Sequence, residues 1–305
     1  MVALLKRLFY ILPVIWLVVS MVFLLIHLVP GDPVQQMLGE GATASDLSAL
    51  RHQYGLDAPL GSQYLHYWRG VFHGDLGRSL RLNDSVSHLV LTRYPYTLEL
   101  TVAALVLALL LAIPAGVLAA LRRARWQDSA VGVISLLGLS FPSFALGPIL
   151  ILLFSIKLGW LPVSGAGSPA HLLLPAITMG GSLAAILTRM VRTAMLEELN
   201  QDYIRTARAK GLPEHVVVYR HALRNAIIPV LTYLGILFGL MLATAPVTET
   251  VFTWPGAGAL YLAAIQSLDY PVIMSETLVI TVMLVGFTLL TDLAYVLIDP
   301  RVRLD

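Results

Sequence analysis

Long apolar runs alternate along the chain with short polar connections. A helix that crosses the hydrocarbon core of a membrane needs about 20 predominantly apolar residues. Apolar side chains occupy all sides of these runs instead of one stripe, which is typical of helices in lipid. The pattern predicts six transmembrane helices, at about residues 8–29, 97–121, 129–156, 173–193, 226–247 and 273–297.

The first apolar run begins after Lys6 and Arg7, as in a secretory signal peptide. It is longer than the roughly 7–15 apolar residues of a signal peptide, and no small-residue cleavage site follows it. We therefore expect a first transmembrane helix that is retained. The polar segment 30–95 contains two helix-like stretches, SDLSALRHQYGL and GSQYLHYWRGVFH, and we expect its tyrosines, Trp68 and Phe72 to form a modest core.

The composition agrees with a membrane protein. Of the 305 residues, 57% are hydrophobic and 12% are charged, whereas about 25% are charged in typical soluble domains. The chain has no cysteine, which excludes disulfide frameworks and thiolate sites. His66 and His73 have helical spacing, but no third metal ligand accompanies them. We predict neither a metal site nor a catalytic residue.

Lysine and arginine are unevenly distributed between the two sides of the six predicted helices. If the N-terminus is cytoplasmic, 14 of the 20 basic residues fall in cytoplasmic segments and 6 in external ones. Short cytoplasmic segments of membrane proteins carry the excess of Lys and Arg. We therefore expect both termini in the cytoplasm and residues 30–95 outside it.

A basic segment, residues 201–230, separates the fourth and fifth apolar runs. Residues 202–210 have the pattern of a short helix with one apolar face. Gly211 stands where this helix would end in a left-handed conformation, and Pro213 suits the first turn of a second helix. The apolar face carries Tyr203, Ile204 and Ala207, and the basic residues, with Arg192 just upstream, are Arg205, Arg208, Lys210, Arg220 and Arg224.

Three interpretations of this segment compete. A basic loop sets membrane topology and lies near anionic headgroups. A helix-turn-helix that binds nucleic acid is disfavoured because the turn is confined between two membrane spans. A docking element for a cytoplasmic partner is favoured by small residues such as Thr206, Ala207, Ala209 and Gly211, which permit close approach. The residues alone leave the first and the third open.

The order of short motifs along nearly the whole chain resembles the permease subunits of ABC importers of the dipeptide, oligopeptide and nickel type. RTARAKGL, followed by RHALRNA and Ile228-Pro229, is similar to the cytoplasmic coupling loop of that family. Each motif alone is weak, but together they follow the family's order. The other similar segments are PGDP (30–33), YGLDAPLGSQY (54–64), GDLGRS (74–79), YTLEL (96–100), SFPSF (140–144), LGWLPVSG (158–165), ETVFTWPGAG (249–258), DYPV (269–272) and DPRVR (299–303).

The resemblance implies an all-α polytopic membrane protein with six transmembrane helices and the type I ABC importer permease fold. Residues 1–29 would hold the first helix, 30–95 an external cap, and 96–305 the remaining five helices with a cytoplasmic coupling loop at 194–225. In the family, the short helix of this loop lies in a cleft of a separate ATPase subunit. The residues implied in that contact are Asp202, Tyr203, Arg205, Thr206, Ala207, Arg208, Ala209, Lys210, Gly211 and Leu212.

One departure from the general importer pattern indicates which branch of the family the chain resembles. The general importer pattern has Glu-Ala-Ala six residues before the glycine, whereas this chain has Arg205-Thr206-Ala207. That variant is similar to the peptide and nickel branch. Asp202 is the candidate for the acidic group that replaces the missing glutamate.

The resemblance also implies partners and a location. They are a homologous second permease, two ABC ATPases and an external solute-binding protein, in the cytoplasmic (inner) membrane of a prokaryote. Membrane lipid is a further partner, and nucleic acid is not. No phosphate loop of the form G-x-x-x-x-G-K-[ST] occurs in the chain, so ATP and Mg²⁺ are expected on the ATPase subunits and no cofactor on this chain.

A few residues are candidates for the translocation path or its gate. Glu276 lies in the outer third of the sixth span and either lines the path or faces a neighbouring subunit. We expect Asp292 to have a structural partner, and Arg189 and Glu99, near span ends, to be interfacial or paired. Residues 249–258 resemble the family's outer gate segment or form a re-entrant turn. The gate candidates are Phe141, Pro142, Phe252, Trp254 and Glu276.

We therefore expect the chain to form half of the membrane path of an importer of short peptides. The same machine importing nickel or another small solute stays open, because in such importers the binding protein usually selects the cargo. An ion-coupled carrier or channel is the alternative from another class. It would be expected to bury ionisable groups at mid-membrane and to show repeat symmetry in its spans, and the sequence offers few such groups.

Overall fold

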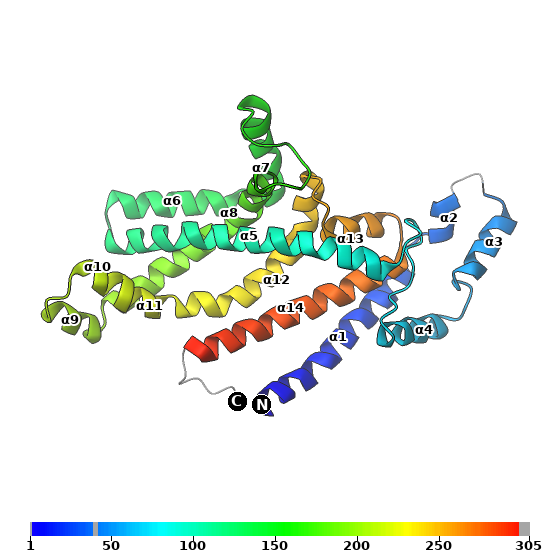
Figure 1. Ribbon diagram of the computed structural model, residues 1–305, viewed down its shortest axis with the longest axis horizontal. Coiled ribbons are helices and arrows are strands. Elements are labelled where there is room, and N and C mark those ends of the chain that lie inside the picture. The colour runs from blue at the N-terminus through cyan, green and yellow to red at the C-terminus, as the bar shows by residue number, and fades with distance from the viewer. Residues whose placement is uncertain (1, 39–41, 299–305) are drawn as a thin grey trace. The chain divides into compact units, whose positions relative to one another are not determined.

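The computed structural model describes residues 2–38 and 42–298. Within that part of the chain the structure is helical, and its extended pairing is limited to one bridge between Arg78 and Ser85. In chain order (Figure 1) the elements are α1 (Val2–Leu28), α2 (Pro33–Leu38), α3 (Ala44–Gln53), α4 (Leu60–Phe72), α5 (Val86–Leu121), α6 (Trp126–Ser140), α7 (Ser143–Leu150), the π-helical η1 (Ile151–Lys157), α8 (Pro169–Leu199), α9 (Asp202–Ala209), α10 (Glu214–Val216), the π-helical η2 (Val217–Ala222), α11 (Leu223–Ala226), α12 (Ile228–Val251), α13 (Ala257–Gln266) and α14 (Tyr270–Ile298).

Five of the described helices, α1, α5, α8, α12 and α14, are long and apolar enough to cross a membrane. The expected third span is instead a pair of helices, α6 and Ala145–Lys157, bent by 111° at the break between them. Phe141 ends α6 in an extended conformation, and Pro142 precedes the first turn of α7. The break follows from proline, because the residue before a proline is disfavoured in a helix. Counting this pair as one span gives the six that the sequence predicts.

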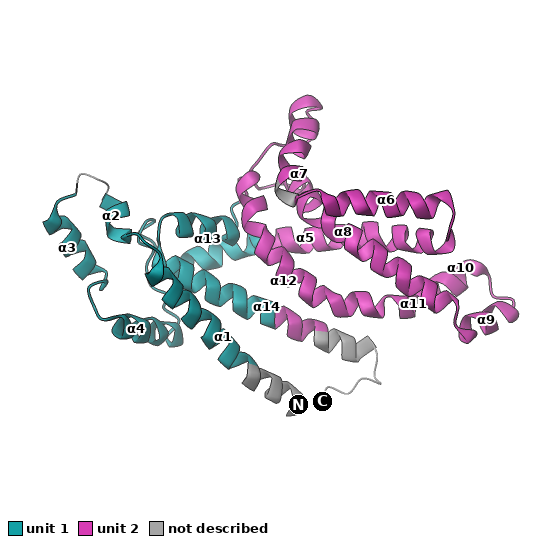
Figure 2. Ribbon diagram, turned by 180° about the vertical axis from the view of Figure 1, so that it is seen from behind, with its two compact units in different colours: residues 1–97, 255–285 teal, residues 98–254, 286–305 magenta. Residues whose placement is uncertain are grey.

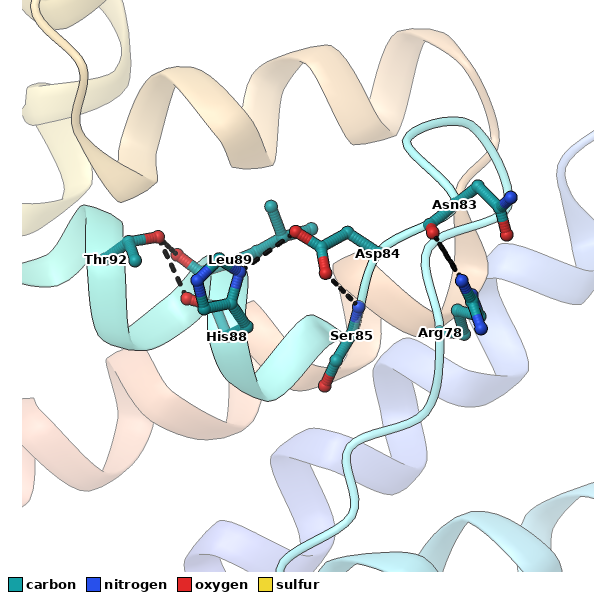
Figure 3. A network of polar contacts seen from close by, with 7 residues as sticks. All are labelled: Arg78, Asn83, Asp84, Ser85, His88, Leu89 and Thr92. Atoms are coloured by element: carbon teal, nitrogen blue, oxygen red, sulfur yellow. Dashed lines mark hydrogen bonds and ion pairs between the residues drawn. The ribbon is translucent and has the colours of Figure 1, made fainter.

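The second membrane helix begins eleven residues earlier than the sequence indicates, at Val86 instead of residue 97. Figure 3 shows polar contacts before and within the first turns of this helix. The Asp84 carboxylate accepts hydrogen bonds from the Ser85 N–H at 2.7 Å and from the His88 ring at 2.9 Å. The bond from His88 lowers the pKa of Asp84 below its usual value. Asp84 lies two residues before Val86, and a negative charge next to the N-terminus of a helix favours helix initiation there.

The chain divides into two compact units (Figure 2). Unit 1 consists of residues 1–97 and 255–285, and unit 2 of residues 98–254 and 286–305. Because α5 and α14 contribute to both units, the division follows packing and not membrane topology. The three segments expected from the sequence, 1–29, 30–95 and 96–305, therefore stay a prediction.

Unit 1 has an apolar core formed by α1, the first turns of α5, α13 and the first half of α14. The aromatic residues of α4, among them Tyr64, Tyr67 and Trp68, pack against this core. The expectation that Phe72 helps to form a core within residues 30–95 is wrong, since its side chain is 82% exposed. α3 and α4 contain no buried residue, and the apolar side chains of α4 pack against the core formed by α1, α5, α13 and α14.

The turn between α13 and α14 is held by a buried carboxylate. Asp269 is 2% exposed and accepts hydrogen bonds from the Ser79 hydroxyl at 2.5 Å, the Leu80 N–H at 3.1 Å and the Arg81 N–H at 3.3 Å. A buried charge of this kind is stable only when its lone pairs are satisfied. The DYPV and GDLGRS motifs therefore meet in unit 1 as a structural contact.

Unit 2 is built around a close approach of α5 and α8. A stripe of small residues at four-residue spacing, Ala104, Ala108, Ala112 and Gly116, runs along α5, and the three alanines are fully buried. A Cβ atom on Gly116 would lie 2.7 Å from Val191, and one on Gly180 would lie 2.6 Å from the Ala104 carbonyl oxygen. Small residues let membrane helices approach closely, because packing and not the hydrophobic effect drives their association in lipid.

Candidate functional site

The loop that connects α8 to α12 is called the basic loop here (residues 200–227). Its first helix, α9, covers Asp202–Ala209, as predicted to within one residue. Ile204 and Ala207 are 0% and 6% exposed, and they belong to the same apolar core as Val217 and Val218 of η2. Burial of a side chain such as Ile204 contributes about 1.5–3 kcal/mol. The rest of α9 is exposed, so one face is fixed to the protein and the other is open.

Tyr203, expected on the apolar face, is 38% exposed and acts through its hydroxyl group. The hydroxyl donates a hydrogen bond to Glu198 at the end of α8 and accepts one from the Asn225 amide of α11 at 3.0 Å. Burial, and secondarily the bond to Glu198, raises the pKa of Tyr203 to about 12, so the phenol keeps its proton at neutral pH. Tyr203 therefore joins α9 to both ends of the loop.

The turn after α9 has the geometry expected of its glycine. Gly211 has φ of +75°. Its N–H donates to the Arg208 carbonyl at 2.9 Å, and the Leu212 N–H donates to the Ala207 carbonyl at 3.4 Å. This pair of bonds is the Schellman motif, which satisfies the last carbonyl groups of a helix. Pro213 immediately precedes the next helix, α10. The second predicted helix therefore begins directly after this proline.

An ion pair crosses this turn. The Arg208 guanidinium donates to both oxygens of Glu214, with Nη2–Oε1 and Nε–Oε2 distances of 2.6 Å and 3.2 Å. Arg208 lowers the pKa of Glu214 and Glu214 raises that of Arg208. Asp202, the sequence candidate for the missing acidic group, is 94% exposed and contacts Arg205 at 3.4 Å. Sequence reasoning missed Glu214, because a six-residue separation across a turn has no helical periodicity.

Arg192, counted among the basic residues of this region, is directed into the protein. Its Nε and Nη2 atoms lie 2.6 Å and 2.8 Å from the two carboxylate oxygens of Asp128. The same carboxylate accepts the Ala124 N–H at 3.0 Å. Bidentate pairs of this kind are among the stronger ionic contacts. The first turn of α6 is thus tied to the last turns of α8, a long-range contact that the sequence pattern did not indicate.

The expected gate residues lie in different surroundings. Phe141 is 50% exposed beside Pro142 at the break between α6 and α7. Phe252 and Trp254 are 1% and 2% exposed, and the Trp254 N–H donates to the Glu249 carbonyl at 2.8 Å. Glu276 is fully buried within unit 1. Phe252 and Trp254 lie together in one turn of unit 2, whereas Glu276 belongs to unit 1.

The segment 249–258 is a turn only in part, and its expected role in an outer gate stays a prediction. It contains the end of α12, a turn at residues 252–256, and the first residues of α13. α13 is an apolar helix of ten residues that the sequence analysis did not predict. Its start is fixed by the Thr97 hydroxyl, which accepts the Ala257 N–H at 2.8 Å. Of the remaining sequence candidates, the side chain of Asp292 and the motif at 299–303 lie outside the described residues.

Two protein-family models match the chain, one over its N-terminal third and one over the rest. Residues 112–304 match the model of the binding-protein-dependent transport system inner membrane component. Residues 1–101 match the N-terminal model of the same transport-system membrane component.

Curated relatives and solved structures agree with this result. The glutathione transport system permease protein GsiC of Escherichia coli K12 is 42% identical over 298 residues, which is 98% of this chain and 97% of that protein. The GsiC protein of Salmonella choleraesuis is 42% identical over 299 residues, 98% of each chain. A structure of the MetNI methionine ABC transporter in an inward-facing conformation shares the fold, with a TM-score of 0.57 and 20% identity over 69% of this chain and 96% of that chain.

Proposed function

The chain belongs to the binding-protein-dependent transport system inner membrane component family, and from this premise we propose that it forms half of the path through which an ABC importer takes up short peptides. Its family membership makes it a permease subunit and a multi-pass protein of the inner membrane. The peptide cargo is supported by the relatives named for glutathione transport, since glutathione is a tripeptide. That this chain itself transports peptides is our proposal.

The mechanism is supported by the difference between the two faces of α9. One face is fixed to the rest of the protein and the other is exposed. Its inner face is buried against η2, Tyr203 binds both ends of the loop, and a capped turn ends the helix at Gly211. An ATPase subunit that binds the exposed face of α9 would displace α9, η2 and the ends of α8 and α12 together. We propose that this displacement converts ATP-driven closure of the ATPase pair into movement of the membrane helices.

We propose a complex of this chain with a homologous second permease, two ATPases and an external solute-binding protein. ATP and Mg²⁺ would be bound by the ATPases and not by this chain, and both termini and the basic loop would be cytoplasmic. The contact residues on this side are those of the open face of the loop, Arg205, Thr206, Ala209, Lys210 and Leu212, all exposed.

Reconstitution of the complex tests this function. The chain is purified together with the second permease, the ATPases and the binding protein of its complex, and is placed in proteoliposomes. Uptake of radiolabelled glutathione, of trialanine and of Ni²⁺ is measured with internal ATP, and again with an ion gradient but no ATP.

We expect ATP-dependent accumulation of at least one of the peptides. Uptake of Ni²⁺ alone would overturn the peptide assignment and leave the importer assignment intact. Uptake that follows the ion gradient without ATP, or a purified chain that retains no ATPase under mild detergent, would overturn the mechanism.

A further inference from the structure

A groove of about 460 Å³ opens on the surface of unit 2, lined by residues of α6, α8 and α12. Apolar side chains form part of its wall, among them Leu139 of α6 and Pro229 of α12. The polar side chains are contributed by α8 and are Arg189, Thr193 and Glu197, all exposed. The groove therefore combines an apolar surface with one positive and one negative charge.

The three polar residues form a stripe on one side of α8, because residues four apart on a helix lie on the same face. Within the described part of the chain, the structure shows no hydrogen bond or ion pair of the Arg189 guanidinium or the Glu197 carboxylate. α8 is otherwise apolar enough to cross a membrane. The stripe occupies the last turns of α8, where the helix leaves the predicted span 173–193 and continues into the basic loop. At this end of the helix the charged side chains can reach water or a neighbouring protein surface.

We infer that this groove receives a short zwitterionic peptide on its way to the cytoplasm, with Arg189 binding the carboxylate and Glu197 the ammonium group. The inference rests on the proposed function and names a binding site for its cargo. Eight residues of helix separate the Cα atoms of the two charged residues by about 12 Å. An extended tripeptide is about 10 Å long. The two side chains therefore reach both ends of a peptide of this length at once.

The position of the groove relates it to the basic loop. Its walls include α8 and the first turn of α12, the two helices that the loop connects. Tyr203 holds α9 to the end of α8 and to α11, directly before α12. A displacement of the loop that carries both of these walls with it therefore moves them against the third wall, formed by Leu139 of α6. ATP hydrolysis can in this way alter the affinity of the groove for the peptide.

Two other occupants have different chemistry. A phospholipid headgroup would bind Arg189 through its phosphate, but it has the wrong charge for Glu197 unless an amine is placed there as well. A helix of the second permease would cover the groove permanently. The pairing of one cation and one anion at the separation of the ends of a tripeptide favours the peptide.

The absence of cysteine from this chain allows a direct test. Thr193→Cys places a single thiol between the two charged residues, and Thr232→Cys is its matched control. Both threonines are exposed on a membrane helix, and each donates a hydrogen bond to the carbonyl four residues before it, at 3.0 Å and 3.1 Å. Thr232 does not line the groove. The assembled importer in inverted membrane vesicles is treated with a membrane-impermeant maleimide, and labelling of this chain is followed with time.

Trialanine is the probe, and N-acetyl-trialanine amide, which has the same three residues and no charged ends, is the control compound. We expect trialanine at tens of millimolar to slow labelling of Thr193→Cys at least about threefold, with no effect of the neutral compound and none on Thr232→Cys. Adding Arg189→Gln or Glu197→Gln to Thr193→Cys should remove the protection.

Labelling of Thr193→Cys that trialanine leaves unchanged would overturn the inference. So would complete protection without any peptide, since the groove would then be a contact with the second permease or with lipid. These outcomes are distinct from failure of the proposed function, because ATP-dependent peptide uptake by the unmodified complex is measured separately, without the cysteine variants or the maleimide.

Discussion

Gly211 determines the geometry of the turn that ends α9. Its φ of +75° lies in the left-handed region, where a side chain with a branched Cβ is strained. No atom lies within 4 Å of the position that its Cβ would take, so a larger residue meets no steric obstacle. A substitution there acts on the backbone alone.

We predict that Gly211→Val uncouples ATP hydrolysis from uptake. A left-handed valine costs about 1–2 kcal/mol, which disfavours the native turn by a factor of about 5–30. Peptide uptake per ATP hydrolysed by the reconstituted complex should fall accordingly. Gly159→Val is the matched control, because Gly159 has φ of +64° and equally open surroundings but lies outside the loop. Unchanged uptake per ATP in Gly211→Val would contradict the proposed role of the turn.

Replacing Asp269 is expected to lower the stability of the fold. Asp269→Ala would leave the Ser79 hydroxyl and the Leu80 and Arg81 N–H groups without their acceptor. Losing buried bonds to a charged acceptor costs about 3 kcal/mol, so we predict a melting temperature lower by several degrees in detergent. Asp57→Ala, which removes an exposed carboxylate bound to His52, should cause no comparable change. Equal melting temperatures of the two variants would contradict the structural importance of Asp269.

At the scale of elements, α9 is short and depends on its neighbours. An isolated helix of eight residues is not stable in water. Its conformation is maintained by the burial of Ile204 and Ala207, by the bonds of Tyr203, and by the Arg208–Glu214 pair across the following turn. The loop is therefore fixed to the ends of α8 and α12 by these contacts.

The Arg208–Glu214 pair has a pH dependence with a definite sign. Because the folded protein lowers the pKa of Glu214 below its ordinary value of 4.5, the pair stabilises the fold above about pH 4.5 and this contribution is lost as the pH falls through the lowered pKa. Both side chains are about half exposed, so the contribution is about 0.5 kcal/mol or less.

We predict that Glu214→Gln lowers the melting temperature in detergent by about 1–2 °C at pH 7 and by less at pH 3.5, where the wild-type carboxylate is becoming protonated. Asp202→Asn is the control, since Asp202 is almost fully exposed and its contact with Arg205 is longer, at 3.4 Å. A difference between wild type and Glu214→Gln that grows as the pH falls would contradict the sign.

Elements whose signal is local were predictable, and contacts between distant residues were not. Hydropathy indicated the spans, and the Gly211-Leu212-Pro213 order indicated the end of α9 and a new helix after it. The contacts of Asp128 with Arg192, of Asp269 with Ser79 and of Tyr203 with Asn225 join residues 64, 190 and 22 positions apart. A single sequence has no periodicity that pairs such residues. α13 was missed because its ten residues are too few for a membrane span.

At the scale of the whole molecule, the sequence predicts which side of the membrane each loop occupies, and single cysteines test it. Leu212→Cys, in the basic loop, and Leu65→Cys, in α4, replace side chains that are 37% and 69% exposed. We predict that a membrane-impermeant maleimide labels Leu65→Cys in intact spheroplasts and Leu212→Cys in inverted vesicles. The opposite pattern would place the termini outside the cytoplasm and exclude an ATPase contact at α9.

The dependence of α9 on the rest of unit 2 has a practical consequence for inhibitors. A linear synthetic copy of residues 198–216 lacks Val217, Val218 and Asn225, which provide the buried surface for Ile204 and Ala207 and one of the bonds to Tyr203. Such a peptide would be unfolded in water and would lose conformational entropy on binding. A decoy that competes for the ATPase cleft would therefore need a chemical cross-link in place of the missing helix.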